Sequence, residues 1–119
     1  MGGYKELIKE VPDFPIQGVN FKDISPLLED HRAFRSAVVD MGRLVKNPDY
    51  WIGIDARGFI FASALSMVFG GGVVLCRKKG KLPPPVESES YSLEYDTATL
   101  QIKQGSGTAV IVDDVLATG

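Results

Sequence analysis

Three short apolar runs, two of them flanking a longer apolar segment, constrain the fold of this chain most. The runs are "WIGID" (51–55), "VVLCR" (73–77) and "AVIVDD" (109–114), and "ARGFIFASALSMVFG" (56–70) separates the first two. Short runs of this kind are typical of strands buried on both faces, and the longer segment has the length of a helix. Strands that alternate with a helix form βαβ units. The pattern therefore predicts an α/β fold, with a mostly parallel twisted sheet flanked by helices.

The remaining segments have weaker patterns. Apolar residues at helical spacing predict a short helix over residues 4–11, and a second helix is expected to begin after Asp30 as its N-cap. Residues 12–28 contain three prolines among apolar side chains, which indicates an ordered loop. Residues 90–105 alternate polar and apolar side chains, which favours an exposed antiparallel hairpin.

Length and composition narrow the class of protein. A chain of 119 residues is expected to form a single domain, residues 1–119, and a net charge of −2 argues against general affinity for nucleic acid. A single cysteine, Cys76, cannot form an internal disulfide. The uncharged stretch 59–76 is broken by three consecutive glycines, so we expect a helix and a strand there rather than a membrane span. With no signal-peptide pattern at the N-terminus, a cytoplasmic location is expected.

Charged residues follow each of the three predicted parallel strands. Asp55 and Arg57 follow the first, Arg77 begins "RKKGK" after the second, and Asp113 and Asp114 end the third. Each feature alone also fits a solvated basic loop, a turn or a helix start. Because the carboxyl ends of parallel strands meet at the edge where open α/β sheets bind ligands, we expect the charges to share one crevice. A basic cluster suits a polyphosphate, and a carboxylate pair suits vicinal hydroxyls or the waters of Mg²⁺.

Other kinds of chemistry lack the residues they need. The sequence contains neither GxxxxGK[ST] nor GxGxxG, and its single histidine, His31, lies at a predicted helix start away from the crevice. No catalytic triad and no His/Cys metal cluster can be assembled. The expected reaction therefore needs no protein nucleophile. Displacement of pyrophosphate from an activated sugar, through a transition state like an oxocarbenium ion, meets that requirement.

Several segments resemble the type I phosphoribosyltransferases, and among them the adenine phosphoribosyltransferases. "VIVDDVLATG" is similar to the phosphoribosyl-pyrophosphate motif of the superfamily, while "PDFPIQGVNFKDISPLL", "DARGF", "RKKGKLP" and "SYSLEY" are similar to adenine-family segments, in the family's order. The resemblance implies the type I phosphoribosyltransferase fold, with a flexible antiparallel hood hairpin over residues 82–105. It implies transfer of the 5-phosphoribosyl group from phosphoribosyl pyrophosphate to adenine, giving AMP and pyrophosphate in purine salvage. Mg²⁺ is the implied cofactor and a homodimer the implied assembly.

The resemblance also implies which residues bind phosphoribosyl pyrophosphate. They are Asp55, Ala56, Arg77, Lys78, Lys81, Asp113, Asp114, Ala117, Thr118 and Gly119. Asp113 and Asp114 would hold the ribose hydroxyls and reach Mg²⁺ through water. Residues 117–119 would begin the cradle for the 5′-phosphate. The basic residues would neutralise pyrophosphate, some of them from the partner subunit, and a cis peptide is expected between Asp55 and Ala56.

The implied adenine pocket consists of Val19, Asn20, Phe21 and Arg57, with Phe21 stacking on the base and backbone groups reading its edge. Glu94 and Arg57 are the implied catalytic residues. Glu94 lies in the hood, where the resemblance has it assist the removal of a proton from adenine.

The chain departs from the family pattern at three places. Lys22 stands where arginine is usual, Asp96 stands where glycine is common, and the family continues past the position of Gly119 with a loop, a helix and more strands. We therefore expect the 119-residue chain alone to be unstable or self-associating and nearly inactive. Two other functions stay open: a fragment or regulator that binds phosphoribosyl pyrophosphate without turnover, and a transferase for another purine.

Overall fold

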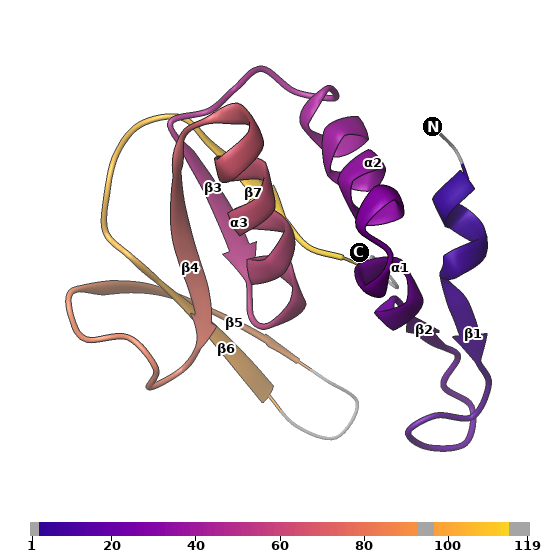
Figure 1. Cartoon of the computed structure of the whole chain (residues 1–119). Coiled ribbons are helices and arrows are strands. Elements are labelled where there is room, and N and C mark those ends of the chain that lie inside the picture. The colour runs from indigo at the N-terminus through magenta and orange to yellow at the C-terminus, as the bar shows by residue number, and fades with distance from the viewer. Residues whose placement is uncertain (1–2, 93–96, 115–119) are drawn as a thin grey trace. The chain divides into compact units, whose positions relative to one another are not determined.

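The computed structural model of the chain describes residues 3–92 and 97–114. The chain divides into two compact units, Met1–Val45 and Lys46–Gly119, here called the N-terminal unit and the sheet unit. Figure 1 labels the helices and strands of both units along the chain.

The N-terminal unit combines a small sheet with short helices. Its elements are η1 (Gly3–Leu7), β1 (Lys9–Val11), β2 (Phe21–Asp23), α1 (Ser25–Glu29) and α2 (His31–Gly42). The helix expected over residues 4–11 is wrong in its second half, because that backbone pairs antiparallel with β2. The loop expected over residues 12–28 contains β2 and most of α1.

The second expected helix is confirmed as α2. Asp30 is its N-cap, and the Asp30 carboxylate accepts a hydrogen bond from the N–H of Ala33 at 3.1 Å. An N-cap of this kind satisfies one of the backbone donors that a helix leaves unpaired at its start. Ala37 and Val38 of α2 are buried together with Leu27 of α1, so apolar packing holds the two helices in this unit.

The sheet unit contains one mixed sheet and one long helix. Its elements are β3 (Tyr50–Ile54), α3 (Arg57–Phe69), β4 (Gly72–Lys78), β5 (Val86–Ser92), β6 (Thr97–Lys103) and β7 (Ala109–Val112). The strand order is β5-β6-β4-β3-β7. Strand β3 pairs in parallel with β4 and β7, which confirms the predicted parallel core. The predicted hairpin is also confirmed: β5 and β6 pair antiparallel, and β6 joins the sheet antiparallel to β4.

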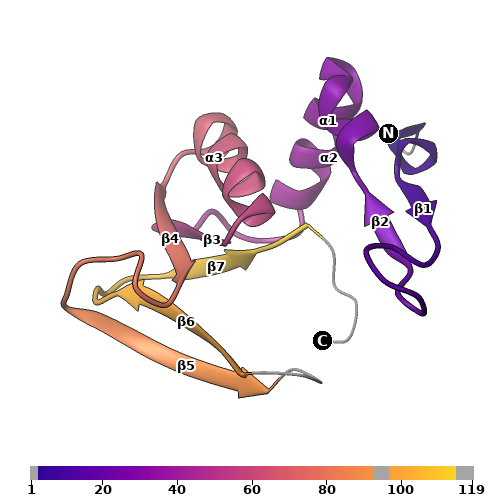
Figure 2. The same ribbon diagram turned by 90° about the horizontal axis from the view of Figure 1, so that it is seen from below.

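Helix α3 lies on one face of the three parallel strands (Figure 2). Phe61 and Leu65 of α3 are buried, as are Trp51 of β3 and Val112 of β7. Trp51 is only 1% exposed, and its indole N–H donates to the carbonyl of Gly70 at 2.8 Å, so its one polar atom is satisfied. This packing fixes the carboxyl ends of the parallel strands relative to the start of α3. No helix in the described ranges is both long and apolar enough to cross a membrane.

Candidate functional site

The parallel register brings the predicted charged residues to one edge of the sheet. Ile54 of β3 lies opposite Cys76 of β4, and Gly53 lies opposite Val112 of β7. The residues that follow these positions are therefore neighbours at the carboxyl ends of three adjacent strands. The sequence-based expectation that Asp55, Arg77 and Asp113 lie at the carboxyl ends of strands sharing one edge is confirmed. Asp55 follows β3, Asp113 follows β7, and Arg77 is the next-to-last residue of β4.

Two glycines allow the start of α3 to pack directly on the sheet. A Cβ atom added to Gly58 would lie 2.6 Å from the carbonyl oxygen of Val112, and one added to Gly53 would lie 2.8 Å from the carbonyl oxygen of Gly58. Both distances are shorter than any real contact of a Cβ atom, and the atoms met belong to the backbone. Only glycine fits at either position. The first turn of α3 consequently lies against β3 and the end of β7.

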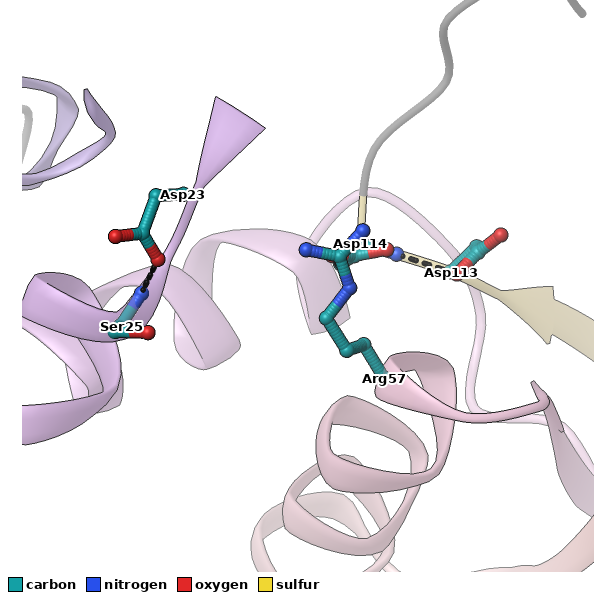
Figure 3. A network of polar contacts seen from close by, with 5 residues as sticks. All are labelled: Asp23, Ser25, Arg57, Asp113 and Asp114. Carbon is teal, nitrogen blue, oxygen red and sulfur yellow. Dashed lines mark hydrogen bonds and ion pairs between the residues drawn. The ribbon is translucent and has the colours of Figure 1, made fainter. Parts of the chain in front are cut away.

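This close packing brings Arg57 to the carboxylates after β7. The Nε atom of Arg57 lies 2.8 Å from Oδ2 of Asp114, and the Asp114 side chain is 5% exposed whereas that of Arg57 is 41% exposed. The N–H of Asp114 donates to Oδ1 of Asp113 at 2.9 Å (Figure 3). Arg57 therefore supplies the positive charge that compensates a nearly buried carboxylate. Partial desolvation of the Asp113 carboxyl raises its pKa above the ordinary value. The hydrogen bond from the N–H of Asp114 and the charge of Arg57 oppose that rise, and the Asp114 carboxylate adds to it.

The loop between β3 and α3 is attached to β4. The peptide between Asp55 and Ala56 is cis, as expected. The N–H of Asp55 donates to the carbonyl of Cys76 at 2.9 Å. The Asp55 carboxylate accepts a hydrogen bond from the N–H of Lys78 at 3.3 Å and lies 3.7 Å from Nε of Arg77. One carboxylate thus contacts both the last residues of β4 and the side chain that begins the basic segment.

The basic residues are grouped at the end of β4. The guanidinium of Arg77 lies 5.9 Å from the centroid of the Phe59 ring, within the range of a cation–π contact, and the side chain is 34% exposed. Residues 78–81, which we call the basic turn, contain three exposed lysines: Lys78, Lys79 and Lys81. Gly80 adopts a positive φ of 87° at the apex of this turn.

The other predicted site residues lie in the N-terminal unit or outside the described residues. Val19 is exposed, and its N–H donates to the carbonyl of Ile16 at 3.3 Å. Phe21 begins β2, with its ring edge-on to that of Phe14 at a centroid distance of 5.1 Å, and Asn20 precedes it. Glu94 and residues 117–119 lie outside the described ranges.

The single histidine and the single cysteine of the sequence both lie within the described residues. His31 is the exposed first residue of α2, as expected. Cys76 lies in β4 but is only half-buried. Burial raises the pKa of its thiol, and the nearby Asp55 adds to that effect, which keeps the thiol protonated at neutral pH.

Some residues that shape the site were not predicted from sequence. Gly53 and Gly58 could have been found from the sequence. A glycine inside an apolar strand and another in the first turn of the following helix indicate a close approach of the helix to the strand. No sequence pattern indicated Phe59 or Gln101. Their contacts depend on which residues of distant strands become neighbours.

The described residues contain no group of three His, Cys, Asp or Glu side chains that could hold a metal ion by themselves. What they offer at this edge is the adjacent pair Asp113 and Asp114, with Asp114 engaged by Arg57. A hard cation such as Mg²⁺ usually keeps several waters and is shared with substrate phosphates. The donor set fits that shared mode of binding rather than a site made by protein alone.

Comparison with known proteins identifies relatives over nearly the whole chain. A model of the phosphoribosyl transferase domain matches residues 24–119. The adenine phosphoribosyltransferase of Mycobacterium sp. (strain KMS) is 46% identical over 95% of this chain and 68% of its own length. That of Mus musculus is 48% identical over 94% and 67%.

Solved structures of adenine phosphoribosyltransferases are also similar to this chain. The adenine phosphoribosyltransferase from Thermoanaerobacter pseudethanolicus superposes with a TM-score of 0.89 at 41% identity, over 98% of this chain and 71% of that one. The Saccharomyces cerevisiae protein, solved in complex with adenine and an imino-altritol bisphosphate, superposes with a TM-score of 0.86 at 30% identity, over 98% and 72%.

Proposed function

The chain belongs to the phosphoribosyltransferase family. We propose that it transfers the 5-phosphoribosyl group of phosphoribosyl pyrophosphate to adenine, like the adenine phosphoribosyltransferases that it resembles. The products are AMP and pyrophosphate, and the reaction is one of purine salvage. The observation that carries the proposal is the carboxylate pair after β7 at the same edge of the sheet as the basic segment after β4. The relative that was solved with adenine bound supports adenine as the base.

The charges match what this reaction develops. The sugar carbon becomes positive as the bond to pyrophosphate breaks, and the leaving group becomes more negative. Arg77, Lys78 and Lys81 supply cations for the leaving group. The carboxylates of Asp113 and Asp114 are acceptors for the ribose hydroxyls, as the family resemblance implies. Because the Asp114 side chain is nearly buried at a packed sheet edge, it needs little reorganisation as the charge develops.

We assign Mg²⁺ to the same site, where Asp113 and Asp114 would hold it through water. When bound, the cation neutralises negative charge on the leaving group. The chain's own contribution is to orient acceptors. The N–H of Asp114 directs Oδ1 of Asp113, and Arg57 directs Oδ2 of Asp114.

The base is assigned to Val19, Asn20, Phe21 and Arg57, following the family resemblance. In that resemblance Phe21 is the stacking residue. Arg57 forms an ion pair with Asp114. Glu94 is assigned the removal of the proton from adenine. A homodimer in the cytoplasm belongs to the same proposal, and light scattering of the purified chain tests the dimer.

The test is formation of the nucleoside monophosphate from phosphoribosyl pyrophosphate with adenine, hypoxanthine or guanine as acceptor, which gives AMP, IMP or GMP respectively. It is made on this chain and on one extended past Gly119 with the segment that follows in the family. We expect adenine to be preferred by orders of magnitude in kcat/KM, because a site that reads a hydrogen-bonding edge leaves its own groups unpaired with the wrong base. Similar kcat/KM for adenine and hypoxanthine would identify a transferase for another purine. Tight binding of phosphoribosyl pyrophosphate by calorimetry without AMP formation would instead indicate a binding protein or regulator.

A further inference from the structure

The backbone N–H groups of the basic turn are all engaged within the chain. The N–H groups of its four residues each have an acceptor: the Asp55 carboxylate for Lys78, the carbonyl of Thr99 for Lys79, the side chain of Gln101 for Gly80 and the carbonyl of Lys78 for Lys81. A phosphate-binding nest needs backbone N–H groups that are directed at the anion. This turn therefore offers an anion its lysine side chains, and its backbone acts as their scaffold.

Two of those four acceptors are side chains, and they hold different parts of the turn. Asp55, already assigned to the site, holds the first residue. Gln101 holds the apex, where its Oε1 accepts a hydrogen bond from the N–H of Gly80 at 3.0 Å. Gly80 has a positive φ and nothing lies within 4 Å of the position of an added Cβ, so no side-chain packing fixes the apex.

The same glutamine is anchored on its other side. Its Nε2 donates to Oγ of Ser88 at 3.1 Å. In the sheet, Gln101 of β6 lies opposite Ser88 of β5 and opposite Arg77 of β4. The side chain thus spans from the outer strand of the hairpin to the basic turn. Both ends of its amide are used, so its orientation is determined by two partners.

We propose that Gln101 is a positioning residue for pyrophosphate. Its amide attaches the apex of the basic turn to the β5–β6 hairpin and thereby holds Lys78 and Lys81 in place for the phosphate oxygens. The inference rests on the proposed function for the identity of the anion. Gln101 acts through the turn and does not itself carry charge, so its loss affects the binding of the anion and not the chemical step.

The test compares two glutamine-to-methionine variants on the same hairpin. Gln101→Met keeps the length of the side chain but removes the acceptor for Gly80. Gln104→Met is the matched control, because Gln104 bonds to Glu87 at 2.7 Å, and the structure gives it no bond to the basic turn within the described residues. We measure the Kd of inorganic pyrophosphate by calorimetry, KM for phosphoribosyl pyrophosphate, kcat and Tm.

We expect Gln101→Met to raise both the pyrophosphate Kd and the KM about 3- to 10-fold, the loss that one hydrogen bond produces, with kcat changed less than about twofold. Gln104→Met should leave Kd and KM unchanged. Ser88→Ala removes only the partner of the Gln101 Nε2 group, so its Kd and KM should lie between those of the two methionine variants. An unchanged pyrophosphate Kd in Gln101→Met, or an equal rise in Gln104→Met, overturns the proposal.

Two further results separate the role of Gln101 in pyrophosphate binding from an effect on folding and from the proposed function. If Gln101→Met does not fold, Ser88→Ala decides, and an unchanged Kd in that variant also overturns the proposal. If the chain extended past Gly119 forms no AMP, the proposed function fails, whereas the pyrophosphate measurements still test the role of Gln101. A purely structural role would lower Tm without changing the Kd of pyrophosphate.

Discussion

At the end of β7 backbone packs directly on backbone, whereas the basic turn after β4 is attached to the sheet by hydrogen bonds. Gly58 allows α3 to approach within contact distance of Val112, and the Asp114 side chain that follows is nearly buried. The lysines of the basic turn are exposed, and side-chain acceptors hold two of its N–H groups. The two charged regions of one site thus depend on different forces.

The difference predicts how substitutions act. Packed backbone does not relax easily, so a change that disturbs the packing of α3 on β7, or the ion pair between Arg57 and Asp114, should reduce stability and activity together. An exposed turn can lose one hydrogen bond or one charge while the fold persists, so a change there should weaken anion binding alone. The comparison of the two regions is therefore tested by the ratio of the change in stability to the change in anion binding for each substitution.

The largest effect is expected for Gly58→Ala. Alanine normally stabilises a helix by about 1 kcal/mol relative to glycine, but overpacking costs about 1–3 kcal/mol, and here the clash is with a carbonyl oxygen that belongs to the sheet. We expect a lower Tm and loss of most AMP formation, because the shift separates Arg57 from Asp114. Gly105→Ala is the control, since an added Cβ meets nothing within 4 Å there. Equal Tm and activity in the two variants would contradict the role of close packing.

Asp114→Asn should have the next largest effect. The substitution keeps the shape of the side chain but removes the charge that pairs with Arg57, which costs at most about 1.5–3 kcal/mol, less the part that water recovers at the half-exposed guanidinium. We expect both a lower Tm and weaker binding of Mg²⁺-phosphoribosyl pyrophosphate. Calorimetric titration and thermal unfolding measure the two. Unchanged affinity would remove Asp114 from the site.

Lys81→Gln should affect binding without affecting stability. The side chain is exposed, so we expect an unchanged Tm and a KM for phosphoribosyl pyrophosphate raised by about 3- to 10-fold at low salt. Because salt screens exposed charges, raising NaCl from about 0.05 to about 0.5 M should increase the KM of the unaltered chain and narrow its difference from the variant. A salt-independent KM would show that the basic turn does not meet the anion.

The smallest effect concerns the pH dependence of stability at Asp113. Its pKa is raised in the folded chain, so the folded state binds the proton more tightly than the unfolded state does. Stability from this group is present at low pH and is lost as the pH rises from the ordinary value of 3.8 through the raised pKa. Asp113→Asn should remove that loss and give a slightly higher Tm at pH 7, together with weaker binding of Mg²⁺-phosphoribosyl pyrophosphate. The exposed Glu89→Gln variant is the control, and a lower Tm at pH 7 for Asp113→Asn would contradict the expected direction.

Much of the sheet unit could be predicted from local patterns. The runs at 51–55, 73–77 and 109–114 contain most of β3, most of β4 and all of β7, because uniform apolar runs are typical of buried strands. Residues 4–11 show the limit of such patterns. Their helical spacing is real, but Val11 pairs with Phe21 in a strand, and a local pattern does not record a partner that lies beyond a loop.

The sequence by itself determined the α/β class, the charged residues at the end of each parallel strand and the family resemblance. Each of these depends on residue types at short spacing along the chain. Only the tertiary structure decided that Arg57 pairs with Asp114, that Phe59 lies beside Arg77 and that Gln101 holds Gly80. Those contacts join residues from different strands and helices. Their existence depends on sheet register and close packing, which fix distances that spacing along the chain does not contain.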